Sequence, residues 1–117
     1  METRERAEVI ARNDATFRAA NERVNEFAAG LDAYDDTPIP FLCECADMRC
    51  TEIVRLTPEE YEAIRQDATR FATVPGHEGD DVATTVVDEN DRYAVVEKLG
   101  VAAEVAAELD PRSGSGT

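Results

Sequence analysis

The chain has 117 residues, the size of one domain, and 43% of them are hydrophobic, which is enough to build a core. Twenty-six Asp and Glu residues oppose twelve Lys and Arg residues, giving a formal net charge of −14 at pH 7. This charge repels phosphates and anionic lipids, so we expect binding neither to nucleic acid nor to a membrane. Charges occupy the N-terminus, where a signal peptide is apolar, and no run approaches the about 18 apolar residues of a membrane span. We therefore expect a cytoplasmic protein.

Residues 2–31 are predicted to form one amphipathic helix. Apolar or small side chains recur at alternating spacings of three and four, with Asn13 as the polar exception. The members of this stripe are Ile10, Phe17, Ala20, Val24, Phe27 and Leu31. Charged residues, Arg18 and Glu22 among them, occupy the other faces. The stripe can pack on the helix's own domain, pair with a second copy in a homodimer, or dock on a partner.

The rest of the sequence predicts short strands and two short helices. The composition of 32–40 indicates a linker, and that of 113–117 a flexible tail. Thr57 is a predicted helix cap, with Pro58 in the first helical position and Glu60 completing a capping box. The predicted strands are 41–45, 51–56, 71–74, 82–87 and 92–97, and the predicted helices are 57 to 66–68 and 101–109. We expect an α+β fold over 41–112, with a small antiparallel sheet of about four strands stabilised by zinc.

All three cysteines lie within eight residues, at Cys43, Cys45 and Cys50, and the one histidine, His77, follows in a Pro-Gly turn. Three Cys and one His form a complete tetrahedral set for zinc, which prefers thiolate and imidazole ligands. Alternate residues of a strand share a face, so the first two cysteines can bind one ion, and the next turn can return the third. Gly76 is expected to let the backbone approach closely. The sequence therefore predicts a zinc site at these four residues.

Two other states of the cysteines also fit the sequence. The spacing C-x-C-x4-C differs from the C-x2-C pairs of zinc ribbons, and free thiols are often small, partly buried core residues. Three Cys and one His can also hold an iron–sulfur cluster. The odd number of cysteines in a chain without a signal argues against a disulfide framework.

Four protein ligands close the coordination shell and leave no position for a catalytic water, so we expect no enzyme activity. A small metalloenzyme with Glu78 as general base beside His77 is one alternative, and a cysteine nucleophile with His77 as its base is another, although no H-E-x-x-H motif is present. A zinc-thiolate redox sensor is a third, because a Cys45–Cys50 or Cys43–Cys50 disulfide would displace the metal. The leading interpretation is a non-catalytic regulatory or adaptor protein that binds another protein.

Acidic residues gather at 35–36, 78–81 and 88–91. Because no D-x-D-x-D-G calcium loop is present, a solvated acidic surface is a simpler interpretation than a set of weak cation sites. As a contact surface, these carboxylates favour a basic protein partner.

Several motifs occur together in this chain. They are F-x-C-E-C from Phe41, then Cys50, L-T-x-x-E-Y-E-x-x-R up to Arg65, P-G-H-E up to Glu78, Tyr93-Ala-Val-Val-Glu-Lys98, and the helical segment Phe17-Arg-Ala-Ala-Asn21-Glu-Arg-Val24. In these motifs the chain resembles an uncharacterised family of small actinobacterial proteins over roughly residues 10–112. The resemblance implies that the three cysteines and His77 act as a set, and it implies no substrate or partner.

Overall fold

The computed structural model describes residues 3–30, 37–45, 47, 49–77 and 83–112. The elements in chain order are α1 (Thr3–Gly30), β1 (Ile39–Leu42), β2 (Ile53–Leu56), α2 (Pro58–Ile64), β3 (Arg70–Thr73), β4 (Thr84–Glu89), β5 (Ala94–Lys98) and α3 (Gly100–Glu108). The predicted α+β class is confirmed, but the strands in the described part form two antiparallel sheets rather than one. Most of the predicted linker, at 32–36, and the predicted tail at 113–117 lie outside the described residues.

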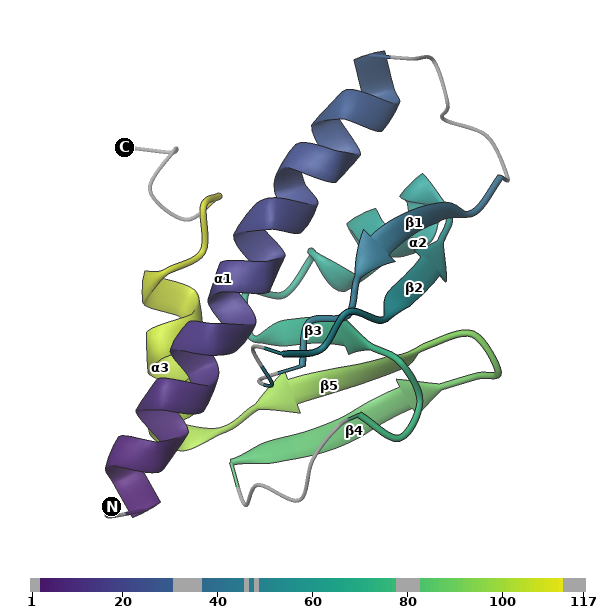
Figure 1. Ribbon diagram of the computed structural model, residues 1–117. Coiled ribbons are helices and arrows are strands. Elements are labelled where there is room, and N and C mark those ends of the chain that lie inside the picture. Colours follow the sequence, from purple (N-terminus) through teal and green to yellow (C-terminus); the bar gives the residue numbers. More distant parts are fainter. Residues whose placement is uncertain (1–2, 31–36, 46, 48, 78–82, 113–117) are drawn as a thin grey trace.

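The two sheets share one apolar core. β1 pairs with β2, and β5 lies between β3 and β4 in the second sheet (Figure 1). Phe41 of β1 stacks on Tyr61 of α2, with ring centroids 4.5 Å apart and planes 6° from parallel. The buried members of this core are Phe41, Cys43, Cys45, Val54, Leu56, Tyr61, Ile64, Ala72, Tyr93 and Val95. Two of the predicted metal ligands therefore belong to the main core of the protein.

The strands are displaced by one or a few residues from their predicted positions. β1 already begins at Ile39, inside the predicted linker, and ends before the cysteines. The predicted strands 82–87 and 92–97 imply a turn at 88–91, but the turn between β4 and β5 lies at 90–93, because the Asn90 side chain organises it. Asn90 Oδ1 accepts hydrogen bonds from Arg92 N at 2.8 Å and from Tyr93 N at 3.0 Å. Such local side-chain bonding to the backbone is the usual role of Asn in turns.

α2 begins as predicted. Thr57 Oγ1 accepts from Glu60 N at 3.1 Å, and Glu60 Oε1 accepts from Thr57 N at 2.8 Å, so both halves of the capping box are present. The helix ends at Ile64, before the predicted end at 66–68.

α1 packs along the domain with a different face from the one predicted. In Figure 1 this helix passes both sheets, with α3 beside its first half. Phe27, a member of the predicted stripe, exposes 69% of its surface, whereas Arg18 and Glu22 are buried. The buried residues of α1 are Ala7, Ala11, Asp14, Ala15, Arg18, Asn21, Glu22, Asn25 and Ala28. Small residues of the first half pack against α3, and polar residues of the second half find polar partners across the interface.

No helix in the described residues combines the length and apolar character needed to cross a membrane.

Candidate metal centre

The first two cysteines directly follow β1, in the segment Cys43-Glu44-Cys45. Both thiol side chains are buried in the main core, with exposures of 2% and 6%. The intervening Glu44 bonds instead to α1 and β3 through its carboxylate. The alternation predicted from a strand therefore continues past the end of β1, and it directs both cysteines to the core.

Cys50 is returned toward the other two cysteines by a turn that starts at Asp47. Cys50 N donates to Asp47 O at 3.0 Å, and Arg49 N donates to Asp47 Oδ1 at 2.9 Å. The hydrogen bond from the Arg49 backbone lowers the pKa of Asp47, because it stabilises the charged carboxylate. The turn leaves Cys50 half-buried at the edge of the core.

His77 is presented by a tight turn over Val74-Pro75-Gly76-His77. His77 N donates to Val74 O at 2.9 Å, and Gly76 has a φ of 95°. Proline in the second position and a positive φ in the third are typical of a type II turn. A Cβ on Gly76 would meet no atom within 4 Å, so the expected close approach is wrong. Glycine is favoured here because side chains rarely adopt this backbone conformation.

The four predicted ligands converge. Their ligand atoms all lie within 4.8 Å of one another, and the Sγ atoms of Cys43 and Cys50 are each 3.6 Å from His77 Nδ1. In a tetrahedral zinc site, bond lengths of about 2.3 Å to sulfur and 2.0–2.1 Å to nitrogen place sulfur and nitrogen about 3.6 Å apart. A single ring nitrogen has one lone pair or one proton, so it cannot bond fully to two thiols, whereas one cation can bind all three atoms. This group could hold a metal ion.

The surroundings of the buried thiols have opposing effects on their pKa values. Burial raises the pKa of Cys43 and of Cys45, because it disfavours the thiolate. The backbone N of Val74 donates to Cys43 Sγ at 3.2 Å, a bond that favours the thiolate. A metal must therefore displace protons from buried thiols when it binds, and its affinity is expected to rise with pH.

Two buried polar residues beside the cysteines were missed as parts of the site. Glu44 is 1% exposed, and burial raises its pKa to about 7 although Asn21 and the Ala72 backbone donate to it. Asn21 of α1 is also 1% exposed. A charged residue between two core positions is the signal that could have identified this contact, because a buried carboxylate needs donors.

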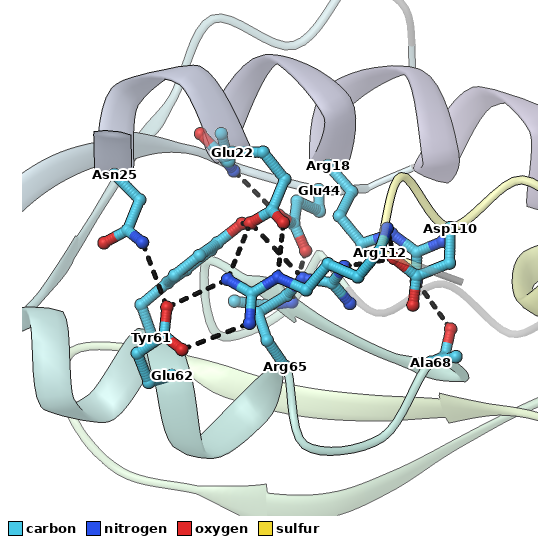
Figure 2. A network of polar contacts seen from close by, with 12 residues as sticks. Arg18, Glu22, Asn25, Glu44, Tyr61, Glu62, Arg65, Ala68, Asp110 and Arg112 are labelled. Atoms are coloured by element: carbon cyan, nitrogen blue, oxygen red, sulfur yellow. Dashed lines mark hydrogen bonds and ion pairs between the residues drawn. The ribbon is translucent and has the colours of Figure 1, made fainter. Parts of the chain in front are cut away.

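A larger ionic network lies where α1, the α2 segment and the C-terminal segment meet, and it was also missed. Figure 2 shows its labelled members: Arg18, Glu22, Asn25, Glu44, Tyr61, Glu62, Arg65, Ala68, Asp110 and Arg112. The buried Arg65 pairs with Asp110, and its Nε lies 3.5 Å from Glu22 Oε2. Tyr61 Oη donates to the same Glu22 oxygen at 2.5 Å, and Arg112 Nε donates to Glu22 Oε1 at 2.5 Å.

Arg18 closes this network toward α3. It is fully buried and donates to the backbone oxygens of Ala68 at 2.5 Å and of Ala106 at 2.7 Å. Its guanidinium carbon lies 4.4 Å from the ring centroid of Phe71, a cation–π distance. Arg18 thereby satisfies two carbonyl groups and covers an aromatic ring at once.

No protein-family model, curated protein or solved structure matches this chain. The family resemblance drawn from the motifs therefore stays a prediction. Glu78, the alternative general base, and the acidic residues at 35–36 and 80–81 lie outside the described residues. Within the described residues, the Cys-His group is the cluster suited to a metal ion.

Proposed function

We propose that this chain binds one structural zinc ion through Cys43, Cys45, Cys50 and His77, and that it acts as a non-catalytic regulatory or adaptor protein. The observation that supports the metal is the convergence of four ligand atoms within 4.8 Å. Thiolate and imidazole ligands favour zinc over magnesium or calcium, which prefer oxygen. Four protein ligands complete a tetrahedron, as in structural zinc sites.

The proposed ion has a clear structural role. Its cysteine ligands come from the segment that joins β1 to β2, and His77 comes from the turn after β3. The ion would therefore join the two-stranded sheet to the three-stranded sheet. Because the domain is small, the free energy of metal binding would add directly to the free energy of folding.

Elemental analysis and an absorption spectrum test the metal, using untagged protein purified without chelator. We expect about one zinc per chain and no visible colour. Cobalt exchanged into the site should give sulfur-to-cobalt charge-transfer bands, which His77→Ala should shift because it removes the nitrogen ligand. Iron together with visible absorption would indicate an iron–sulfur cluster in place of zinc. A folded protein without metal would overturn the proposal.

We further propose that the partner is a basic protein. The net charge of −14 supports this, as does a half-open cleft of about 350 Å³ between α2 and the β4–β5 part of the sheet. Ile64 and Val95 are apolar residues of its lining, and Asp88 adds an exposed carboxylate, whereas Glu60 of the lining is already paired with Arg92. A cleft of this kind suits an aliphatic stem that ends in a positive charge.

An oligo-arginine peptide is a suitable probe for this cleft. Asp88→Lys should weaken its binding more than Asp91→Lys, a control with the same change of charge at a neighbouring exposed position that does not line the cleft. Equal effects of the two variants would show that net charge alone attracts the peptide, and would count against binding in the cleft.

Self-association through α1 is tested separately. Phe27 is the most exposed large apolar side chain of this helix in the described part of the chain, so Phe27→Asp should leave the fold intact. If α1 joins two copies, the variant sediments as a monomer and the parent as a dimer. Identical masses of parent and variant would show that this part of the helix is no interface.

A redox sensor is the second candidate, and it is favoured by the half-buried position of Cys50 beside two buried sulfur atoms. Two zinc-bound thiolates would form one disulfide and release Zn²⁺, and their two electrons would reduce hydrogen peroxide to two hydroxide ions. Mild peroxide should then release zinc from the parent, with recovery on adding a dithiol. Zinc retained under these conditions would contradict the redox sensor and leave the structural role as the only role proposed for the metal.

A further inference from the structure

The side chain of Asn21 connects α1 to the chain that carries the cysteines. Its Oδ1 accepts from Leu42 N at 2.8 Å, and its Nδ2 donates to Leu42 O at 2.9 Å. Asn21 thus pairs with the last residue of β1 as a neighbouring strand would. The second Nδ2 hydrogen goes to Glu44 Oε2, at 2.8 Å, so the amide uses both of its hydrogens.

Glu44 connects the same segment to the strand that leads to His77. Its Oε1 accepts from Ala72 N at 2.9 Å, and its own N donates to Ala72 O at 2.8 Å. Two residues further along, Val74 N donates to Cys43 Sγ, and Val74 O holds the turn of His77. The cysteine segment and the histidine turn are therefore fixed to each other through one buried carboxylate.

We infer that Asn21 and Glu44 are positioning residues of the metal centre, and that they couple metal binding to the docking of α1. This inference rests on the proposed metal-binding function. Without Asn21, the backbone N and O of Leu42 lose their partners, and the segment between Leu42 and Cys45 can relax. The cysteines are then no longer held in advance at the spacing that the metal needs, so part of the binding free energy is spent on ordering them.

Coupling of this kind acts equally in both directions. If docking of α1 strengthens metal binding by some factor, metal binding must strengthen the docking of α1 by the same factor. Metal removal should therefore loosen the part of α1 around Asn21, and it should do so less in a variant that lacks the amide. The helix would report the state of the metal centre to any partner that contacts its exposed face.

Asn21→Ala tests the inference, with Asn25→Ala as the matched control. Asn25 is the same residue type one helical turn further on and is also buried, but its Nδ2 donates to Glu62 Oε2, at 3.0 Å, away from the cysteines. In competition with a zinc chelator, Asn21→Ala should lose about 10- to 100-fold in zinc affinity, the usual effect of removing a residue that orients metal ligands. Asn25→Ala should stay within about twofold of the parent.

Two further measurements separate positioning from general stability. The cobalt spectrum of Asn21→Ala should shift, because the tetrahedron of ligands is distorted, whereas that of Asn25→Ala should not. Amide exchange in the middle of α1 should rise on metal removal in the parent, and rise less in Asn21→Ala. Glu44→Gln keeps the shape of the side chain but turns one acceptor into a donor, and it should also weaken zinc binding if Asn21→Ala fails to fold.

The outcomes are distinct. A parent that binds no metal overturns the proposed function and this inference with it. A parent that binds zinc, with Asn21→Ala equally tight or with Asn25→Ala weakened as much, overturns the inference and leaves the proposed function intact.

Discussion

The candidate metal centre and the buried ionic network would hold the same domain together by different physical means. The centre gathers four ligand atoms from three short segments between residues 43 and 77, all within reach of one ion. The network joins α1 to α2 and to the segment after α3 through pairs of charged side chains. In a metal site, the stabilisation of the fold therefore depends on one ion. In the network it is distributed over many contacts of unequal strength.

Charge balance makes the network tolerable in a buried position. The guanidinium groups of Arg18, Arg65 and Arg112 face the carboxylates of Glu22, Glu62 and Asp110, and the buried Glu44 also interacts with Arg18 and Arg65. Desolvation of buried ions is expensive, and only good pairing offsets it. The network therefore adds little net stability as a whole, but the loss of any one buried partner is costly, because the other charge stays behind.

The largest expected effect comes from the metal centre. Cys45→Ser removes one thiolate, and in zinc-loaded protein the free energy of unfolding should fall by more than about 4 kcal/mol, since loss of a metal is among the few changes of that size. Chelator-treated parent and variant should differ by about 1 kcal/mol or less, the usual size of a mild core substitution. Urea denaturation with and without zinc measures both, and equal stability of the two proteins in zinc would contradict a structural metal.

The buried pair of Arg65 and Asp110 should give the next largest effect. Asp110→Ala leaves the guanidinium of Arg65 buried without its main partner, and we expect a loss of about 3–5 kcal/mol. Arg65→Met combined with Asp110→Ala removes both charges, so much of that loss should be recovered. Urea denaturation of zinc-loaded protein measures the three variants, which are Asp110→Ala, Arg65→Met and the double variant. A double variant as unstable as the sum of the single ones would show that the two residues act independently.

Glu22 gives the network a pH dependence. Burial alone would raise the pKa of this carboxyl, but hydrogen bonds from Arg112 and Tyr61 and the charge of Arg65 lower it from 4.5 to about 2. A lowered pKa in the folded state means that the stabilisation is complete above pH 4.5 and is lost as the pH falls toward 2. A difference of one in pKa corresponds to about 1.4 kcal/mol, so the free energy of unfolding should fall by on the order of 3 kcal/mol when Glu22 is protonated.

Glu22→Gln isolates that contribution. The difference in unfolding free energy between parent and variant, both chelator-treated so that acid removes no metal from either, should shrink as the pH is lowered from 4.5 toward 2. Any effect of acid on the metal ligands is shared by the two proteins and cancels in the difference. A difference that stays constant over this range would mean that Glu22 has an ordinary pKa.

The convergence of the four candidate ligands could be predicted because cysteine and histidine are scarce in this chain and chemically distinctive. Three Cys within eight residues and one His leave a single way to build a complete set. Their convergence depends on the turns at Asp47 and Gly76, whose residue types are typical of turns. The position of Glu44 between two core cysteines indicates that this carboxylate needs donors, but nothing local indicates that Asn21 is the residue that meets it across the fold.

The buried face of α1 shows the limit of hydrophobic periodicity. Phe17, Val24 and Phe27 suggested an apolar stripe, yet Arg18 and Asn21 are the buried residues and Phe27 is exposed. Arg18 is buried because two backbone oxygens and an aromatic ring lie within its reach, and these come from residues 50 or more positions away. Charged residues are usually on the surface, so sequence alone favours the wrong face whenever distant segments supply the partners.

The smallest expected effect belongs to the contact that the sequence predicts best. Thr57→Ala removes the side chain that caps α2 and should cost about 1 kcal/mol, whereas Thr57→Ser keeps the oxygen and should stay close to the parent. Urea denaturation resolves this difference when the zinc load is the same. A loss above about 3 kcal/mol would mean that the cap also fixes Glu60 for its pairing with Arg92, and so carries a tertiary contact. A loss near 1 kcal/mol would show that short-range patterns are easy to recognise because they depend on few residues, and that they contribute little for the same reason.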